Sequence, residues 1–370
     1  MKRKLKFAMV GGGLGSFIGP IHRMAAKMDN SAELVAGNFS RSAKVNKATG
    51  MELGLDPARV YADWQSMIDA EKDKVDFVTV CTPNDSHYAI ARAALEAGLH
   101  VMCEKPLSLT LKEAEALEKL AAKKKLVLAI PFTYTGNAAV KLARDLVKSG
   151  KLGKICKVNL EYVQGSFRKI AVDRHNSWKM DPKISGPSCV VADIGVHGAN
   201  LIEYVTDLKI ESVLADISSF APGNKLDDDA SILMRLEKGA KAAMVTSKIA
   251  TGEENGVRLR VYGDKASLFW DQEDTNYLVV KEPFGPDRIY KRNAPYIKNV
   301  SPLAVETARI PAGHHEGFIE AFANIYRGFT AAVAKRKGID YPSANDGVRT
   351  MRFVEAVLKS AKAGSRWTKL

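Results

Sequence analysis

The sequence contains little cysteine and no long hydrophobic run. Its four cysteines, Cys81, Cys103, Cys156 and Cys189, show no C-x-x-C spacing, so we expect reduced thiols in a cytoplasmic setting, without a disulfide framework or a zinc site. The apolar stretch after the basic start, Phe7–Val10, is too short for a signal-peptide core, and no run approaches the length of a membrane span. We therefore expect a cytoplasmic protein with no membrane partner.

Acidic residues are outnumbered by basic ones, 42 to 55, which gives a net charge of +13 at pH 7. The basic clusters lie far apart in the sequence, at Lys2–Lys4, Lys123–Lys125 and Lys335–Lys337. No basic stretch is interleaved with aromatic residues, so the excess indicates a lysine-rich solvated surface and no nucleic-acid partner. A weak positive field can still attract an anionic cofactor.

Internal repeats and low-complexity linkers are also missing, and 370 residues are enough for two domains. Up to residue 132, short apolar runs alternate with helical patterns, which predicts an N-terminal Rossmann domain with a doubly wound parallel sheet over residues 1–132. The expected strands are Leu5–Val10, Leu34–Ala36, Phe77–Cys81, His100–Cys103 and Leu126–Pro131. The expected helices include Ser86–Ala97 and Leu111–Lys124.

The pattern changes after Pro131. Strands of alternating polarity now follow one another, and turn signals such as Glu237-Lys238-Gly239 separate them, which predicts an antiparallel sheet with one solvent-facing side. Residues 133–370 are therefore expected to form a C-terminal α/β domain with a large, mostly antiparallel open sheet. Its expected strands include Ile155–Val163, Ser231–Leu236, Ala242–Ser247 and Arg258–Tyr262, and its expected helices are 137–148, 196–205, 316–334 and 344–361.

A glycine-rich loop follows the first expected strand, Val10-Gly11-Gly12-Gly13-Leu14-Gly15-Ser16-Phe17-Ile18-Gly19. Gly11 and Gly13 allow a tight turn and a close approach of the backbone to a pyrophosphate, and the following helix points its N–H groups at the phosphates. The loop therefore predicts a dinucleotide site. Ser16 stands where the usual fingerprint has its third glycine. If Gly19 takes that role, the loop is longer than usual.

The choice between NAD and NADP stays open in the sequence. A site for NAD usually ends its second strand with an acidic residue that binds the ribose 2′-hydroxyl, and the segment Leu34–Arg41 contains none. Arg41 can pair with a 2′-phosphate or simply point to solvent, while Asn38 or Ser40 can serve an unmodified ribose.

Two further motifs carry groups suited to redox chemistry at an alcohol. Lys105 follows the strand His100–Cys103, beside a proline, and Asp193 and His197 lie four residues apart at the start of an apolar helix. Oxidation of an alcohol needs a hydride acceptor, a base for the hydroxyl proton and a group that stabilises the developing alkoxide. Histidine titrates near neutrality, a lysine at a strand end lies where ligands gather, and Asp193 can orient the substrate or the imidazole. Together with the glycine loop, these residues predict a nicotinamide-dependent oxidoreductase.

These features resemble the glucose–fructose oxidoreductase and inositol dehydrogenase (Gfo/Idh/MocA) family over nearly the whole chain. The matching motifs are the glycine loop, Ile18-Gly19-x-x-His22, Thr82-Pro83-Asn84, Glu104-Lys105-Pro106, Asp193-Ile194-Gly195-Val196-His197, Gly313-His314-His315-Glu316-Gly317-Phe318 and Asp346-Gly347. The resemblance implies a Rossmann domain, an α/β domain with an open sheet, a cleft between them, and dimers or tetramers built on that sheet. It also implies catalytic roles for Lys105, Asp193 and His197 and a cis bond between Lys105 and Pro106.

The same resemblance implies the cofactor contacts. They are expected from the glycine loop, the end of the second strand and the loops after the third and fourth strands, at Gly11, Gly13, Leu14, Gly15, Ser16, Phe17, Ile18, Ser40, Arg41, Thr82, Pro83, Asn84, His87, Glu104 and Lys105. The cofactor is NAD or NADP.

For the substrate we expect a pocket walled by Lys105 and by Tyr134, Trp178, Lys179, Asp193 and His197. Hydroxyl-bearing and charged groups with a stacking ring favour a sugar, cyclic polyol or glycoside over a lipid. We expect His314 and His315 at a helix start, outside the chemistry. No metal is expected, because Asp193 and His197 lack further ligands. Two alternatives stay open: a NAD-dependent glycosidase that oxidises its substrate transiently, and a non-catalytic dinucleotide-sensing regulator.

Overall fold

The computed structural model describes residues 3–166 and 177–370, and the chain divides into two compact units. Unit 1 comprises Met1–Phe132 and Phe322–Val348, and unit 2 comprises Thr133–Ala321 and Arg349–Leu370. The boundary after Phe132 coincides with the change of pattern in the sequence. The segment Phe322–Val348 belongs to unit 1 although it follows unit 2 in the sequence, because its aromatic side chains pack on β3: the Phe329 and Phe77 ring centroids lie 5.0 Å apart.

Unit 1 is built on a five-stranded parallel sheet of order β2-β1-β3-β4-β5. Its central strands are apolar on both faces, as parallel strands covered by helices must be; every residue of Phe77–Cys81 is buried. The strands are β1 (Leu5–Gly11), β2 (Ala32–Asn38), β3 (Phe77–Cys81), β4 (His100–Cys103) and β5 (Leu128–Ala129). The predicted Rossmann sheet is confirmed.

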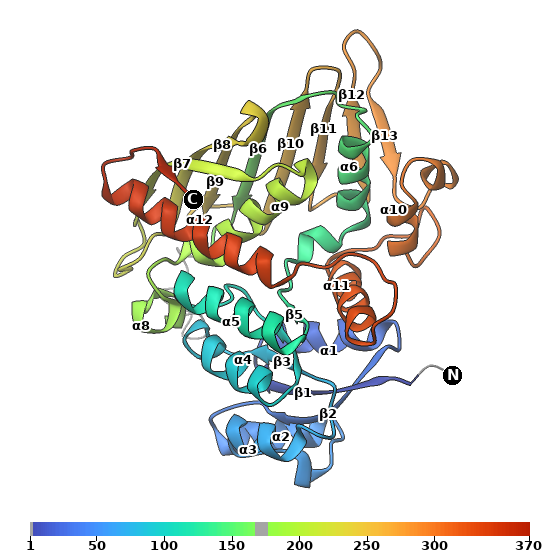
Figure 1. Cartoon of the computed structure of the whole chain (residues 1–370). Coiled ribbons are helices and arrows are strands. Elements are labelled where there is room, and N and C mark those ends of the chain that lie inside the picture. Colours follow the sequence, from blue (N-terminus) through green and yellow to red (C-terminus); the bar gives the residue numbers. More distant parts are fainter. Residues whose placement is uncertain (1–2, 167–176) are drawn as a thin grey trace. The chain divides into compact units, whose positions relative to one another are not determined.

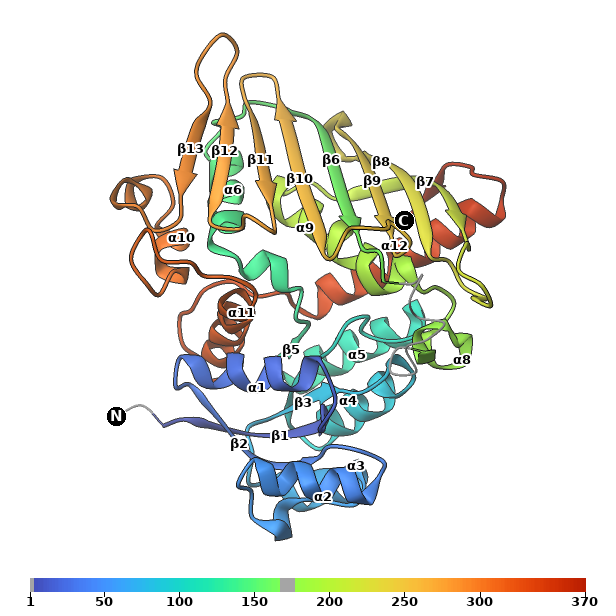
Figure 2. The same cartoon turned by 180° about the vertical axis from the view of Figure 1, so that it is seen from behind.

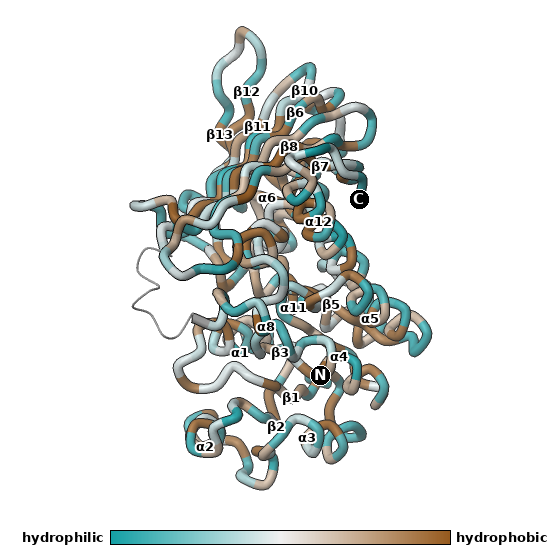
Figure 3. The backbone as a smooth tube through the Cα atoms, turned by 90° about the vertical axis from the view of Figure 1, so that its left-hand side faces the viewer, coloured by the Kyte–Doolittle hydropathy of each residue, from teal (hydrophilic) through white to brown (hydrophobic). Residues whose placement is uncertain are grey.

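Helices connect and cover these strands (Figure 1). Local sequence sets their ends: α5 begins with a capping box in which Thr110 and Glu113 exchange hydrogen bonds, and it ends at Lys125 in the left-handed conformation. Brown and teal segments alternate along α5 in Figure 3, as expected of a helix with one buried side. The helices are α1 (Ile18–Met28), α2 (Ala43–Glu52), α3 (Trp64–Glu71), α4 (His87–Glu96), α5 (Leu111–Lys124) and, mostly in this unit, α11 (Phe318–Val333), with short turns η1 (Pro57–Arg59) and η2 (Asn84–Ser86).

Unit 2 contains a nine-stranded sheet of order β13-β12-β11-β10-β6-β9-β8-β7-β14. Strands β6 and β9 pair in parallel and the other neighbours are antiparallel, so the predicted mostly antiparallel sheet is confirmed. The strands are β6 (Ile155–Val163), β7 (Ile210–Ser218), β8 (Asp229–Leu236), β9 (Lys241–Ser247), β10 (Gly256–Gly263), β11 (Ser267–Asp271), β12 (Tyr277–Lys281), β13 (Arg288–Lys291) and β14 (Thr368–Lys369).

One face of this sheet is covered by helices and the other is open. Helix α9 packs on β6, and α6 packs on β11 and β12; Figure 2 shows the opposite face without a helix in the part of the chain that the structure describes. Residues of β8 alternate accordingly, with Ile232 and Met234 buried and Leu233 exposed. The remaining elements are α6 (Ala138–Lys148), α8 (Pro182–Ser185), α9 (Val196–Thr206), α10 (Pro302–Thr307), α12 (Ala344–Lys362), η3 (Thr133–Gly136), η4 (Ser177–Met180), η5 (Val191–Gly195), η6 (Glu237–Gly239) and η7 (Pro295–Asn299).

Among residues 3–166 and 177–370, the structure has no helix whose length and apolar character would let it cross a membrane.

Candidate active site

The glycine loop makes the tightest backbone contacts of unit 1. A Cβ added to Gly19, in the first turn of α1, would lie 2.2 Å from the carbonyl oxygen of Gly12. Gly19 therefore takes the role of the third glycine, which allows close packing of helix and strand, and the loop is longer than the usual fingerprint. Gly11 has φ 79°, and a Cβ there would lie 2.5 Å from the carbonyl oxygen of Cys81, so both positions require glycine.

The N-terminus of α1 is open to a ligand. The residue before the helix, Phe17, is 76% exposed and makes no side-chain cap, and the first turn contains no acidic residue. Ser16 Oγ accepts one of the first N–H groups, that of Gly19, at 3.3 Å. The N–H of Leu14 is held by Thr49 Oγ1 at 3.1 Å, which fixes the loop against α2. Such an uncapped helix start behind a glycine turn has the chemistry of a phosphate site.

The end of β2 offers no carboxylate. Asn38 is buried and its side-chain amide donates to the carbonyl oxygen of Tyr61 at 3.0 Å, so the amide is already used inside unit 1. Ser40 Oγ accepts from the N–H of Ser42 at 3.1 Å. Arg41 is exposed. Both Ser40 and Arg41 are therefore at the surface position where the sequence predicted the adenosine ribose.

Glu104 lies at the end of a buried chain of hydrogen bonds. His22 Nε2 lies 2.9 Å from Glu104 Oε1, His22 Nδ1 lies 2.8 Å from the Tyr326 hydroxyl, and that hydroxyl lies 3.1 Å from Thr79 Oγ1. The second carboxylate oxygen accepts the backbone N–H of Lys105 at 3.1 Å. Burial raises the pKa of Glu104, but the contact with His22, together with the charges of Lys105 and His87, holds the pKa below its usual value. An ionised carboxylate thus orients the peptide that carries Lys105.

A second contact ties the loop after β3 to the loop after β4. The two ring nitrogens of His87 lie 2.8 Å from the Pro106 carbonyl oxygen and 2.9 Å from that of Thr82. Burial lowers the pKa of His87, against the effect of these carbonyl groups. The Lys105–Pro106 bond is cis, as the resemblance implied. Within unit 1 the structure therefore brings together the glycine loop, Thr82–Asn84, His87, Glu104 and Lys105.

In unit 2, Asp193 lies on a π-helical turn, η5, and α9 begins only at Val196. The sequence predicted a helix over 196–205, which agrees with the observed bounds of α9, whereas the π turn before it was not predicted. The buried carboxylate of Asp227 accepts the N–H groups of Cys189 and Val191, at 2.8 and 2.9 Å, and holds the start of this turn.

The Asp193 carboxylate contacts two lysines. Its Oδ2 atom accepts from Lys179 Nζ at 2.9 Å and from Lys248 Nζ. The Lys248 side chain is 2% exposed; burial lowers the pKa of Lys248, although the Asp193 carboxylate opposes this effect. For Lys179 burial also lowers the pKa, but the carboxylate prevails and the pKa is raised. Lys179 was expected in the site, whereas Lys248 was not.

His197, buried in α9, borders an aromatic cluster. Its ring lies 5.3 Å from the ring of Tyr134 and 6.1 Å from that of Tyr162. The two phenol oxygens are 2.7 Å apart, the Tyr162 hydroxyl donates to Asn255 Oδ1, and Asn255 Nδ2 donates to the Tyr134 oxygen, both at 3.1 Å. Burial raises the pKa of Tyr134 and raises that of Tyr162 well above its usual value, so both phenols stay neutral beside His197.

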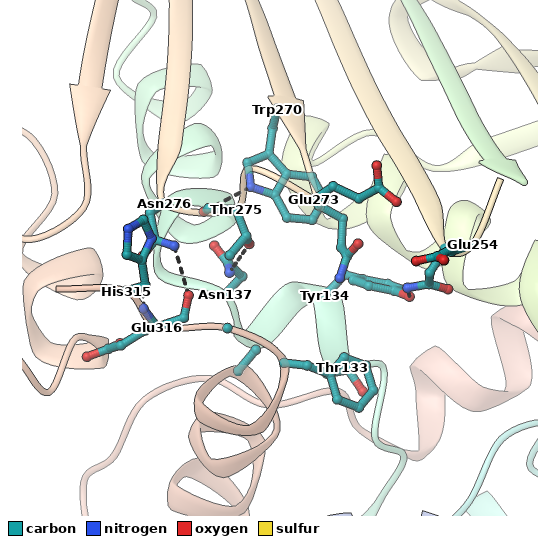
Figure 4. Close-up of a pocket in the computed structure, with 15 residues that line it drawn as sticks. Thr133, Tyr134, Asn137, Glu254, Trp270, Glu273, Thr275, Asn276, His315 and Glu316 are labelled. Carbon is teal, nitrogen blue, oxygen red and sulfur yellow. Dashed lines mark hydrogen bonds between the residues drawn. The ribbon is translucent and has the colours of Figure 1, made fainter. Parts of the chain in front are cut away.

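Tyr134 also lines a pocket of about 600 Å³ in unit 2, drawn in Figure 4. Of the residues expected to wall the substrate, Tyr134 lines this pocket, whereas the others do not: Lys105, Trp178, Lys179, Asp193 and His197. Lys179 Nζ instead lies 5.8 Å from the centre of the Trp178 ring. His315 lines the pocket, so its expected position at a helix start needs correction: α11 begins at Phe318, and the residues before it form a loop.

No cluster of three or more His, Cys, Asp or Glu side chains with the arrangement of a metal site occurs in the described parts of the chain.

Comparisons with known proteins agree with this architecture. Residues 5–132 match an oxidoreductase family with an NAD-binding Rossmann fold, and residues 140–269 match the GFO/IDH/MocA C-terminal domain. An uncharacterised oxidoreductase of Bacillus subtilis (strain 168), YfiI, is 35% identical, over 99% of this chain and 97% of the relative. An inositol dehydrogenase homolog from Azotobacter vinelandii has been solved with NAD+ (36% identity, TM-score 0.95) and with NADH and myo-inositol (35% identity, TM-score 0.93); each comparison covers 100% of this chain and 98% of the other.

The fold and the glycine loop define a class, the oxidoreductases with an NAD-binding Rossmann domain. The two family matches and the relative at 35% identity then place the chain within that class: it belongs to the Gfo/Idh/MocA family.

Proposed function

We propose that this protein is an NAD-dependent dehydrogenase that oxidises, or in reverse forms, a ring hydroxyl of a sugar, cyclic polyol or glycoside. The observation that carries the proposal is the arrangement in unit 2 of Asp193, held by two lysines, and His197, buried beside two neutral phenols. The two lysine contacts hold the Asp193 carboxylate in place one turn before His197.

The residues of unit 1 fit a dinucleotide. The Gly19 contact leaves no room for a side chain, and the uncapped start of α1 presents N–H groups and no acidic residue, which suits a pyrophosphate. The solved homolog with NAD+ supports NAD as the cofactor. When bound, NAD accepts the hydride from the carbon that bears the hydroxyl.

The protein's own part is to handle the hydroxyl proton and the oxygen. In the proposed reaction His197 and Lys105 take part in proton transfer, and the Lys105 ammonium stabilises the developing alkoxide. Asp193 accepts from the substrate or orients the imidazole, and its lysine contacts hold the carboxylate in place. Glu104, through the Lys105 N–H, fixes the backbone from which the lysine extends. The net change is alcohol plus NAD+ to ketone, NADH and a proton.

A sugar-like substrate is favoured by the polar groups expected around it. Asp193, Lys179, Tyr134 and Asn255 offer donors and acceptors that suit a ligand with several hydroxyl groups, whereas an apolar alcohol has a single hydroxyl to offer them. The homolog solved with NADH and myo-inositol supports a cyclic polyol or a related ring.

The test is a screen of cyclic polyols, sugars and glycosides with NAD and NADP, followed at the absorbance band of the reduced nicotinamide. We expect reduction with at least one ring polyol. Lys105→Ala and His197→Ala should each lower kcat by about 10² to 10⁴ while NAD binding, measured by calorimetry, persists. The exposed residues Lys112 and His314 provide matched controls, Lys112→Ala and His314→Ala. Turnover of apolar alcohols alone, or glycoside cleavage without net NADH, would contradict the proposal.

We further propose that a second copy of the chain covers the open face of the nine-stranded sheet. That face exposes apolar side chains on adjacent strands: Leu233 is 49% and Val245 41% exposed, and Ser231 pairs with Val245 and Leu233 with Ala243 across β8 and β9. Such a patch on a wide sheet is typical of an interface. Sedimentation should give a dimer or tetramer, and Leu233→Lys with Val245→Lys should shift it toward monomer. A monomeric wild type would contradict this.

A further inference from the structure

The pocket in unit 2 has the chemistry of a second carbohydrate site. It lies between the segment Thr133–Asn137, the end of β11 with the turn that follows it, and the loop before α11. Figure 4 shows side chains from these elements around a common space. Its volume of about 600 Å³ falls inside the range of small-molecule pockets.

The pocket wall combines flat rings with groups that bind hydroxyls. Trp270 and Tyr134, both almost completely buried, form the aromatic part of the wall, and Asn255, Gln272 and Thr275 supply amide and hydroxyl groups that both donate and accept. The sugar ring is the ligand that matches both, since it has apolar C–H faces and a hydroxylated rim.

The charge of the wall excludes an acidic ligand. Glu254, Glu273 and Glu316 line the pocket, and among the described residues that line it there is no lysine or arginine. The Glu316 carboxylate is paired with Arg292, so a phosphate or carboxylate group in the pocket would meet the carboxylates of Glu254 and Glu273, and a neutral ligand is favoured.

Two residues connect this pocket to the proposed catalytic group of unit 2. Tyr134 and Asn255 both line the pocket, and they hydrogen bond to each other through Asn255 Nδ2 at 3.1 Å. The Tyr134 ring in turn lies 5.3 Å from the His197 ring. Tyr134 therefore contacts both His197 and the pocket, which lie one aromatic side chain apart.

From this geometry we infer that the pocket binds a second neutral sugar ring, or a hydroxylated aglycone, attached to the ring that is oxidised. The inference rests on the proposed function and narrows its substrate class to glycosides and disaccharides. Gln272 and Glu273, on the turn that follows β11, bind the outer ring, and Trp270 provides its apolar wall.

The experiment compares methyl glucoside with the neutral disaccharides maltose and cellobiose. We expect the wild type to have a higher kcat/KM for at least one disaccharide. Gln272→Trp, which fills the pocket, should lower the ratio of kcat/KM for that disaccharide to kcat/KM for methyl glucoside about tenfold or more, as expected for one or two lost hydrogen bonds. Gln65→Trp, at an exposed position of α3, is the matched control.

The outcomes separate the two proposals. Oxidation of methyl glucoside with the same ratio in wild type and Gln272→Trp would overturn the second site and leave the proposed function standing. Oxidation of none of the three would overturn the proposed function for glucosides. Calorimetry with each disaccharide, with and without NAD, then tests whether the pocket binds a sugar ring. Binding by the wild type that Gln272→Trp abolishes supports the second site, and no binding by the wild type overturns it.

Discussion

Lys248 donates a hydrogen bond to Asp193 Oδ2, the same carboxylate oxygen that accepts from Lys179 at 2.9 Å. Lys248 comes directly after β9 and its side chain is almost completely buried, whereas the Lys179 side chain is 24% exposed. One lysine is thus a fixed internal partner of Asp193, and the other can exchange the carboxylate for a ligand.

Replacement of the buried lysine should slow the proposed reaction. In Lys248→Met the Asp193 carboxylate keeps Lys179, which is partly exposed, but loses its buried partner, so the carboxylate is less firmly placed and kcat should fall by about tenfold to 10²-fold. Lys241→Met, an exposed lysine at the other end of β9, is the control. An unchanged kcat in Lys248→Met at a lowered melting temperature would assign Lys248 a purely structural role.

Gly19→Ala should disrupt the cofactor loop. The added methyl group would lie 2.2 Å from the Gly12 carbonyl oxygen, so strand and helix must separate, at about 1–3 kcal/mol of stability. We expect a lower melting temperature and weaker NAD binding by calorimetry. Gly285→Ala serves as control, because a Cβ there meets nothing closer than 3.8 Å. Equal effects of both substitutions would mean that Gly19 does not contribute to the dinucleotide site.

Arg41 allows a test of the preference between the two cofactors. This residue is exposed at the end of β2, where no carboxylate is available for the ribose. If its guanidinium binds a 2′-phosphate, Arg41→Ala should weaken NADP by about tenfold or more and leave NAD nearly unchanged. We expect the other result, small and equal effects on the dissociation constants of both cofactors, since we propose NAD. Lys44→Ala, exposed in the first turn of α2, controls for a general loss of positive charge.

Much of the fold could be predicted from local sequence, because the signals are themselves local. The mostly apolar run Phe77–Cys81 and the alternation in Ser231–Leu236 indicate strands buried on two faces and on one face, and the structure has both. Helix α5 occurs with its predicted bounds, Leu111–Lys124. The π turn at Val191–Gly195 was not predicted, since it depends on Asp227, more than thirty positions later in the chain.

The candidate site was predictable only in part. Motifs gave the glycine loop and Lys105, but the His22–Tyr326 contact joins residues 304 positions apart, which no local pattern encodes. The position of Lys248 could have been predicted from the sequence. The inward residues of β9 are Ala242, Met244 and Thr246, and if the alternation continues past the strand, Lys248 points inward as well. An inward lysine one residue past a strand indicates a partner carboxylate.

The phenol cluster should make the protein sensitive to alkali. Burial raises the pKa of Tyr162 well above its usual value, so the folded state keeps a proton that the unfolded chain releases near pH 10. The unfolded state then binds fewer protons than the folded state, and stability falls as pH rises above about 10. Chemical denaturation from pH 8 to 11 should show this decline.

In Tyr162→Phe the decline above pH 10 should be shallower, because one buried phenol no longer releases its proton on unfolding. At pH 8 the variant should be less stable by about 1–3 kcal/mol, since Tyr134 and Asn255 each lose a hydrogen-bond partner. Tyr262→Phe removes an exposed tyrosine of β10 and should leave the slope unchanged. An equal change in the slope of stability against pH in both variants would mean that the Tyr162 phenol is already open to solvent in the folded protein. That result would contradict the assignment of buried, neutral phenols beside His197.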